Sequence, residues 1–323
     1  MTQHRIVNPH FDENRLIWSD EYSGRYEPPP RPYSEQFDLQ WKLALDNHPR
    51  YVNHPGADLD DAYIADRIYE WTGEHPSGDR FHDASAGTRV LDRPLAVDVI
   101  RDRECVDIGC GMGRWTKTMQ ALGARSVLSI DASDSALRSV SAFNDRTLKA
   151  NIMELPNEHP ELCAAFDFAC FWGVAMCTHD PRKAFLSAAS LVRPGGSLYL
   201  MVYAPEGING RQVTNIQRRA FNRLDTVEDR LAYVTHVYER RWDSSYVLKE
   251  NLKNRLRELL RRPRGGEIGV LDMLQPFYNW VIPLEVIHGW VRDAGFATAE
   301  VLNASESPKA AYHVLATKSA PEP

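Results

Sequence analysis

The chain has 323 residues, of which 43% are hydrophobic and 25% are charged; this balance is typical of soluble globular proteins and excludes a largely disordered chain. Its net charge of −6 argues against a long basic surface that follows nucleic-acid phosphates. No segment is apolar enough for a membrane helix. The five scattered cysteines form no Cys-x-x-Cys pair, so we expect a cytoplasmic protein without a zinc or redox site.

Residues 1–95 are rich in proline and aromatic residues, and we expect them to form an N-terminal arm followed by a helical cap. Phe37, Trp41 and Leu45 recur at four-residue spacing, which predicts an amphipathic helix. Residues 61–71 repeat this pattern. We interpret both apolar stripes as packing surfaces, because that is the more common use of such a stripe.

From residue 96 onward the pattern changes to strands that alternate with helices, which is typical of βαβ units and a mainly parallel sheet. A helix is well signalled at 181–192, where Asp180 precedes Pro181. A second is expected at 284–294. The predicted strands cover 104–108, 126–131, 146–151, 166–172, 197–203, 298–302 and 311–317.

These elements predict a core that is interrupted once. We expect residues 96–204 and 283–318 to form the core, and the charged stretch 205–282 to form a helical lid inserted between its two parts. A basic run at 253–264 lies within this lid. We interpret it as a solvated helix face.

The segment 105–116 has the pattern of a buried strand that runs into closely spaced glycines, Gly109, Gly111 and Gly113, and then into a helix. Glycines are needed where a ligand presses against the end of a strand and the backbone of the following turn. A dinucleotide site would have its third glycine at position 114, which is an arginine, so a dehydrogenase is less favoured. Asp131 ends the next strand, 18 residues after Gly113. An acidic residue that binds ribose hydroxyls is expected there, although Asp131 can also simply begin a turn.

With these motifs the sequence resembles the class I S-adenosylmethionine-dependent methyltransferases. The glycine-rich first motif of that family matches 106–113, its acidic second-strand end matches Asp131, and its Leu-x-Pro-Gly-Gly turn matches 191–196, here one residue longer. The resemblance implies a Rossmann-like α/β fold, with a mainly parallel seven-stranded sheet flanked by helices. It also implies S-adenosylmethionine as the cofactor and S-adenosylhomocysteine as the product.

Carried over residue by residue, the resemblance implies a cofactor site at the ends of the first four strands. The methionine part is implied to lie against Asp107 and the glycine loop, the ribose against Asp131, and the adenine against the residues that follow. Trp172 is implied to lie near the sulfonium, because an aromatic face attracts positive charge, although ordinary packing is an equal alternative. The implied set is Asp107, Gly109, Cys110, Gly111, Gly113, Asp131, Ala132, Asn151, Ile152 and Trp172.

Methyl transfer from a sulfonium depends mainly on alignment and on exclusion of water, and a base is needed chiefly for a hydroxyl acceptor. His179, on the loop after the fourth strand, is the candidate base, but it can equally be a surface residue. Similar enzymes often carry the histidine at the positions of Met176 or Cys177.

Two further residues are implied to face the acceptor, since small-molecule members of the family often carry an Asp and a Tyr on the segment before the last helix. These are Asp272 and Tyr278; the tyrosine can instead pin the lid to the core. Tyr51 and His54 reach the same pocket if the N-terminal segment folds over it. No His, Asp or Glu cluster has metal-ligand spacing, so no metal is predicted.

The first hypothesis for function is O-methylation of a sugar or another polar small metabolite in a biosynthetic pathway. N- or C-methylation is the nearest alternative. A cofactor-binding module that no longer transfers methyl groups and a nicotinamide oxidoreductase are more distant ones. The sequence lacks the Asn-Pro-Pro-Tyr that similar DNA and amide-nitrogen methyltransferases carry after the fourth strand. We therefore expect a small-molecule acceptor, no nucleic-acid or membrane partner, and allow a homodimer.

Overall fold

The structure is a computed structural model of the chain, and it describes residues 16–46, 59–77, 91–206, 215–243, 266–307 and 309–320. Tyr51, His54 and the basic run 253–264 lie outside these residues.

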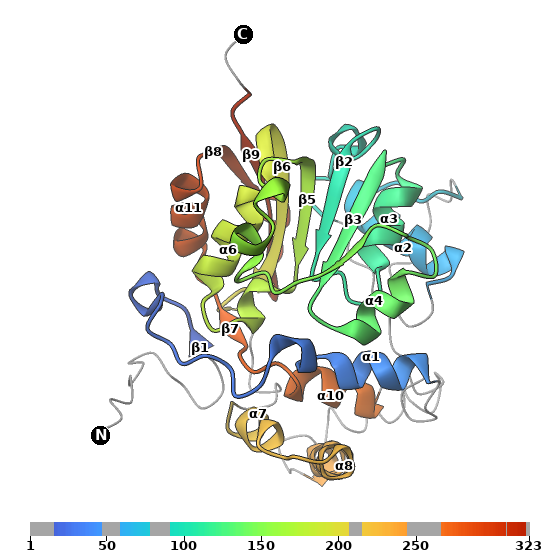
Figure 1. Cartoon of the computed structure of the whole chain (residues 1–323), viewed down its shortest axis with the longest axis vertical. Helices are drawn as coiled ribbons and strands as arrows, with labels where there is room; N and C mark the ends of the chain where they lie inside the picture. Colours follow the sequence, from blue (N-terminus) through green and yellow to red (C-terminus); the bar gives the residue numbers. More distant parts are fainter. Residues whose placement is uncertain are drawn as a thin grey trace.

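A seven-stranded sheet forms the centre of the fold (Figure 1). β2 and β5 are neighbours in its middle; β3 and β4 extend it on one side, and β6, β9 and β8 on the other. β9 is antiparallel to both of its neighbours, and the remaining strand pairs are parallel. The predicted Rossmann-like, mainly parallel sheet is confirmed. In spatial order the strands are β4 (Thr147–Lys149), β3 (Ser126–Asp131), β2 (Glu104–Ile108), β5 (Phe166–Trp172), β6 (Val192–Tyr203), β9 (Ala311–Lys318) and β8 (Phe296–Val301).

Separate groups of helices cover the two faces of the sheet, because successive strand residues point to opposite sides. Cys105 packs on the face covered by α2 and α3, where Trp71 stacks on Trp115 with ring centroids 4.3 Å apart. Val106 packs on the opposite face, which α6 and α11 cover. These helices are α2 (Asp61–Thr72), α3 (Arg114–Ala121), α4 (Asp134–Val140), α5 (Leu155–Glu158), α6 (Pro181–Ser190) and α11 (Leu284–Asp293).

The predicted boundary between α6 and the following strand is partly wrong. α6 begins at Pro181 as predicted, and the carboxylate of Asp180 accepts a hydrogen bond from the Lys183 amide at 2.9 Å. β6, however, begins at Val192 rather than at residue 197. The turn lies within the strand as an irregularity, since Gly195 has a φ of 78° and the pairing with β5 shifts register there.

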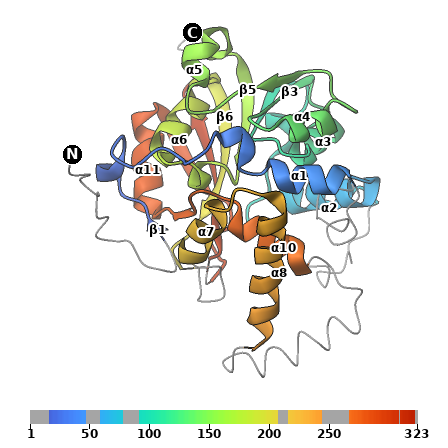
Figure 2. The ribbon, with the colours of Figure 1, turned by 60° about the horizontal axis from the view of Figure 1, so that its bottom comes forward.

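Four helices lie beneath the lower edge of the sheet in Figure 1. α1 comes from the N-terminal segment, and the other three come from the predicted lid. α1 and α10 lie side by side directly below the sheet, and α7 and α8 lie beyond them, as the second view also shows (Figure 2). The bounds are α1 (Asp38–Leu45), α7 (Asn215–Asn222), α8 (Val227–Asp243) and α10 (Gly266–Leu274).

A short second sheet ties the N-terminal segment to the lid. β1 (Leu16–Ile17) pairs in parallel with β7 (Trp280–Val281). Beside it, Trp18 packs against Trp280 with ring centroids 4.9 Å apart, at an edge-to-face angle. The sequence did not predict this sheet, because two-residue strands are too short to show a periodic pattern.

Candidate cofactor and acceptor cavity

A cavity of about 510 Å³ lies at the carboxyl ends of the central strands, and residues of α1 and α10, which lie below the sheet (Figure 1), also line it. Parallel sheets bind ligands at the point where the strand order reverses, which here is the junction of β2 and β5. The volume falls within the range of about 300–1,000 Å³ that is usual for small-molecule sites. The cavity therefore has the position and the size of a cofactor site.

The glycine loop after β2 forms one wall of the cavity. Gly109 has a φ of 70°, and a Cβ atom placed on it would lie 2.3 Å from Cγ2 of Val174, in the loop after β5. Gly111 has a φ of 53°, and its Cβ would lie 3.1 Å from the Trp41 ring. Cys110 lines the cavity between them. Side chains at the two glycines would strain the backbone and fill the space where the loops meet.

Gly113 serves packing and does not line the cavity. A Cβ atom on Gly113 would lie 2.6 Å from the Phe143 ring and 2.8 Å from Val140 at the end of α4. The third glycine therefore lets the start of α3 approach α4 closely.

Asp131 ends β3 and lines the cavity. Its carboxylate accepts hydrogen bonds from the backbone amides of Gly111 at 2.9 Å and of Ser133 at 2.8 Å. Burial raises the pKa of this carboxyl group, and the amide hydrogen bonds oppose that rise. Each carboxylate oxygen still has a lone pair for a further donor, which suits a ligand with two neighbouring hydroxyl groups.

The residues expected to contact adenine line the same part of the cavity. Ala132, Asn151 and Ile152 all belong to the lining. The Asn151 side-chain oxygen accepts a hydrogen bond from the Met153 amide at 3.1 Å. Together with Ile130 they form a mainly apolar slot beside Asp131, which fits a planar base. We call the part of the cavity lined by the glycine loop, Asp131 and this slot the cofactor end.

Asp107 lies behind this wall and not in it. Its side chain is 1% exposed, and it accepts a hydrogen bond from the Thr116 hydroxyl at 2.7 Å. Burial raises the pKa of the Asp107 carboxyl to about 7. In this structure Asp107 therefore supports the loop from inside the core.

Trp172 lines the cavity at the end of β5, where the resemblance implied the sulfonium. The guanidinium carbon of Arg114 lies 4.1 Å from the centre of a Trp172 ring. Arg114 lines the cavity as well. Trp172 thus presents an aromatic face that attracts a cation, and the Arg114 guanidinium lies over this face in the structure.

These features fit S-adenosylmethionine. The glycine loop lines the cavity without side chains at Gly109 and Gly111, Asp131 offers acceptors for ribose hydroxyls, and the apolar slot beside it suits adenine. In the family, this cofactor supplies a methyl group carried on a positively charged sulfur.

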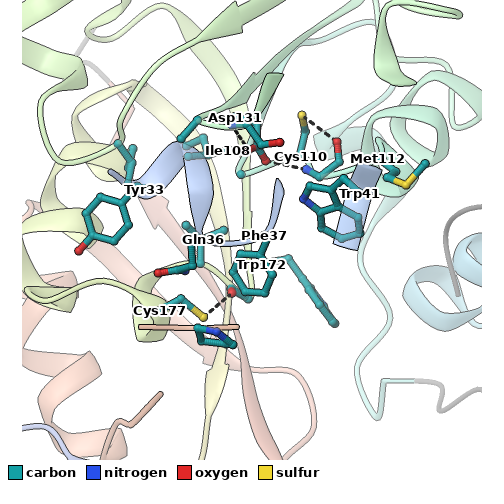
Figure 3. Close-up of a pocket in the computed structure, with 18 of the residues that line it drawn as sticks. Tyr33, Gln36, Phe37, Trp41, Ile108, Cys110, Met112, Asp131, Trp172 and Cys177 are labelled. Atoms are coloured by element: carbon teal, nitrogen blue, oxygen red, sulfur yellow. Dashed lines mark hydrogen bonds between the residues drawn. The ribbon is translucent and has the colours of Figure 1, made fainter. Parts of the chain in front are cut away.

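The opposite part of the cavity, which we call the acceptor end, is lined by the N-terminal segment and by α10. Tyr33, Gln36 and Phe37 contribute from the former, and Asp272 from the latter. Figure 3 shows Tyr33, Gln36 and Cys177 away from the group formed by Asp131, Ile108 and Cys110. We assign to the acceptor end the lining residues Tyr33, Gln36, Phe37, Cys177, Thr178, Tyr203, Ile268, Gly269, Asp272 and Pro276. The Trp41 ring, which lies beside Gly111, marks its boundary with the cofactor end.

Asp272 is the carboxylate of the acceptor end among the described residues. Its side chain is accessible because it faces the cavity, yet the surrounding protein raises the pKa of its carboxyl group. The amide of Gln40, on α1, donates a hydrogen bond to it at 3.3 Å. Burial raises the pKa of the Tyr203 hydroxyl, and the nearby Asp272 charge adds to that rise. A carboxylate that faces a cavity and whose pKa is raised is suited to exchange a proton with a ligand.

His179 lies outside the lining but contacts it through Tyr33. The His179 amide donates to the Tyr33 hydroxyl at 2.8 Å, and this hydroxyl lies 2.7 Å from His179 Nδ1. Because the oxygen already accepts one proton, it can donate its own to the ring nitrogen. Burial lowers the pKa of His179, which favours the neutral, accepting ring. Figure 3 shows the Tyr33 hydroxyl pointing away from Trp172 and Trp41.

Tyr278 also lies outside the described lining. Its hydroxyl donates to the Glu27 carbonyl at 2.5 Å, and its ring packs edge-on against Tyr26. Of the three residues expected to face the acceptor, the structure therefore places Asp272 in the cavity, and His179 and Tyr278 behind its wall.

The sequence reasoning missed the contribution of the N-terminal segment. Phe37 and Trp41 were recognised as an apolar stripe but were assigned to packing, and they line the cavity instead. Tyr33 and Gln36 belong to no sequence motif or periodic pattern that would predict a place in the cavity. An apolar stripe shows which face of a helix is covered, and it does not show whether protein or a ligand covers it.

The fold, the glycine loop and the acidic strand end together define a Rossmann-like enzyme that binds a nucleoside cofactor. A family model described as a methyltransferase domain matches residues 79–260, more than half of the chain. The protein therefore belongs to this family of methyltransferase domains. The resemblance to class I methyltransferases is confirmed, and S-adenosylmethionine is the cofactor of the class.

The relatives found by sequence are distant. One is the tRNA U34 carboxymethyltransferase of Pseudoalteromonas translucida, 32% identical over 114 residues, which are 34% of this chain and 35% of that protein. Another is the mitochondrial ubiquinone biosynthesis O-methyltransferase of Schizosaccharomyces pombe, 28% identical over 211 residues, which are 60% of this chain and 68% of that protein. The chain thus spans about a third of the length of the first relative.

Among solved structures, an S-adenosylmethionine-dependent methyltransferase from Mesorhizobium loti has a TM-score of 0.42 and 17% identity, covering 68% of this chain and 92% of that one. Within the described part of the chain, no group of three or more His, Cys, Asp or Glu side chains is placed to hold a metal ion. No described helix combines the length and the apolar character needed to cross a membrane.

Proposed function

We propose that the protein transfers a methyl group from S-adenosylmethionine to an oxygen atom of a small molecule held at the acceptor end. One observation carries this proposal: Asp272 shares a single cavity with the glycine loop and with Asp131. A proton acceptor and a cofactor site that open into one space are what O-methylation requires.

Asp272 is proposed to take the proton of the acceptor hydroxyl. Ordinary carboxylates are weak bases at neutral pH, and desolvation by the surrounding protein raises the pKa of Asp272, which makes its carboxylate a stronger base. The hydrogen bond from Gln40 holds the carboxylate on the side of the cavity that α1 covers. The reaction therefore depends on α1 and α10 as well as on the Rossmann-like core.

His179 and Tyr278 are proposed to act as positioning residues. His179 fixes the Tyr33 ring in the wall of the cavity through two contacts. Tyr278 fixes the N-terminal segment through the Glu27 carbonyl. We further propose that residues 1–95 and 205–282 form the cap and the lid that shape the acceptor end.

A small acceptor is favoured over a nucleic acid by the cover over the cavity. α1 lies across it and is held at both ends of the cavity. The Asp38 carboxylate accepts hydrogen bonds from the Ser133 hydroxyl at 2.8 Å and the Ser135 amide at 3.2 Å, and the Gln275 side chain donates to Gln40 at 2.5 Å. The relative from S. pombe is named as an O-methyltransferase, which supports oxygen as the methylated atom.

The proposal is tested by incubating the protein with S-adenosylmethionine that carries a deuterated methyl group and a panel of hydroxylated, amino and carbon-acid metabolites, sugars included. We expect mass spectrometry to find the label on an oxygen atom, and NADH not to bind. A label found on nitrogen or carbon would replace O-methylation by the alternative chemistry. Binding of S-adenosylmethionine without transfer to any class would favour a non-catalytic module.

A further inference from the structure

Several hydrogen-bonding groups of the acceptor end are engaged within the protein. The Thr178 hydroxyl donates to the Ala175 carbonyl at 2.8 Å, the Tyr33 hydroxyl is engaged by His179, and the Gln36 side-chain oxygen accepts from the Phe277 amide at 3.3 Å. Among the described residues of the acceptor end, Asp272 is the charged group that remains directed at a ligand. A ligand bound here therefore faces one charged group in a wall that is otherwise neutral.

The walls of the acceptor end, and of its boundary with the cofactor end, are flat and aromatic. Phe37 and Trp41 are partly stacked, with ring centroids 6.2 Å apart and an angle of 29° between the rings. Tyr33 and Tyr203 contribute further rings to the lining, and Trp172 lies at the boundary with the cofactor end. Figure 3 shows the Phe37, Trp41 and Trp172 rings around the same space. Aromatic walls favour a planar, apolar ligand through stacked and edge-on contacts.

From these two observations, and building on the proposed function above, we propose that the methyl acceptor is a phenol. Its planar ring lies among Phe37, Trp41 and Tyr203, and its hydroxyl group faces the Asp272 carboxylate. The substrate class thus narrows from small polar metabolites in general to aromatic rings with a hydroxyl group.

A polyol such as a sugar fits this end less well. Each hydroxyl group that is buried without a partner costs free energy, and the Tyr33 hydroxyl, the Thr178 hydroxyl and the Gln36 side-chain oxygen are already engaged within the protein. An alkylammonium ion fits less well for an electrostatic reason. The cavity already contains the Arg114 guanidinium, and the sulfonium of the cofactor adds a second positive charge. A third cation would be repelled by both.

The chemistry balances without any further reactant. The phenol oxygen forms a bond to the methyl carbon while the bond from that carbon to sulfur breaks, and the electron pair of the broken bond remains on sulfur. The phenol proton passes to the Asp272 carboxylate and from there to water. The products are an aryl methyl ether and S-adenosylhomocysteine.

The test uses matched probes on the full chain saturated with S-adenosylhomocysteine. Catechol, 2-naphthol and guaiacol represent phenols of different size. o-Phenylenediamine has the shape of catechol with nitrogen nucleophiles, and cis-cyclohexane-1,2-diol has its hydroxyl groups without the aromatic ring. We expect at least one phenol to bind at least tenfold more tightly than the diol, and the same phenol to be O-methylated when S-adenosylmethionine replaces the product.

Two variants connect this result to the proposed walls. Phe37→Leu is expected to raise KM for the phenol by about threefold to tenfold, because it removes an aromatic contact, and to leave cofactor affinity unchanged. Phe277→Leu is the matched control, since the Phe277 ring, on the segment that follows α10, packs against Arg31 of the N-terminal segment but lies outside the described lining. It is expected to leave KM unchanged.

The inference is overturned if S-adenosylhomocysteine binds but no phenol binds or reacts, if the diol binds as tightly as catechol, or if methyl groups appear on o-phenylenediamine alone. Equal effects of the Phe37 and Phe277 variants on KM would also overturn it. Failure of S-adenosylhomocysteine to bind the folded protein is a different result, because it removes the proposed function itself.

Discussion

The two ends of the cavity are built in different ways. The cofactor end is formed where β2, β3 and β4 finish, so its residues follow directly from strands of one sheet. The acceptor end combines the N-terminal segment with α10, which are far apart in the chain and meet beneath the sheet (Figure 1). The residues of the cofactor end are therefore brought together by local sequence, and those of the acceptor end by tertiary packing. Substitutions at the two ends should therefore have separable effects.

The largest effect is expected from Asp272→Asn, which keeps the shape of the acceptor end but removes its proton acceptor. The kcat for methyl transfer to an oxygen should fall by about 100-fold or more, while the affinity for S-adenosylmethionine stays unchanged. Steady-state kinetics and calorimetry measure the two quantities. In the unaltered protein kcat should rise with pH through the pKa of Asp272, because only the ionised carboxylate accepts the proton. Loss of cofactor binding in this variant would show that the two ends are not separable.

The reverse pattern is expected from Asp131→Ala at the cofactor end. Loss of hydrogen bonds to a charged carboxylate should weaken cofactor affinity by about 1.5–3 kcal/mol, or about 10-fold to 150-fold. Asp134→Ala is the control, since the Asp134 side chain is 69% exposed and pairs with Lys149. A titration in which both variants bind equally would contradict the role of Asp131.

Asp107→Asn tests the support behind the glycine loop. The folded-state pKa of about 7 lies above the ordinary value of 3.8, so the folded protein retains a proton that the unfolded chain loses. The free energy of unfolding should therefore fall as pH rises from about 4 to about 7, by at most about 1.4 kcal/mol for each unit of pKa difference. Asp107→Asn should reduce this slope in urea unfolding measured across pH. If the pH dependence of the free energy of unfolding is unchanged in Asp107→Asn, a group other than Asp107 causes it.

A smaller effect is expected from Gln40→Leu, which removes the hydrogen bond between α1 and Asp272. The kcat should fall about fivefold, since one net hydrogen bond contributes about 1 kcal/mol. The pH profile should move to higher pH, because the Gln40 hydrogen bond lowers the pKa of Asp272. Gln275→Leu provides the comparison, since it removes a Gln40 contact but leaves the bond to Asp272. If Gln40→Leu and Gln275→Leu shift the pH profile of kcat equally, Gln40 acts by packing alone.

The contrast between the two ends also explains what the sequence predicted. β2, β3 and β5 have their predicted bounds, because buried strands followed by glycines or an aspartate have local signals. Asp131, Ala132 and Asn151 line the cavity because they end or follow such strands.

The positions of the other site residues depend on contacts between segments that are distant in the chain. His179 has the chemistry of a base, but Tyr33 lies between it and the cavity. Phe37 has the pattern of a packing residue, and it lines the cavity because a space remains between the sheet, α1 and α10. Neither outcome follows from spacing along the chain, because each is fixed by where α1 docks.

The most direct test of the central claim is calorimetric titration of S-adenosylhomocysteine into the unaltered protein, Asp131→Ala and Asp272→Asn under identical conditions. We expect the unaltered protein and Asp272→Asn to bind with the same Kd, and Asp131→Ala to bind at least tenfold more weakly. No binding to the folded, unaltered protein, or equal weakening in both variants, would contradict a cavity with a distinct cofactor end and acceptor end.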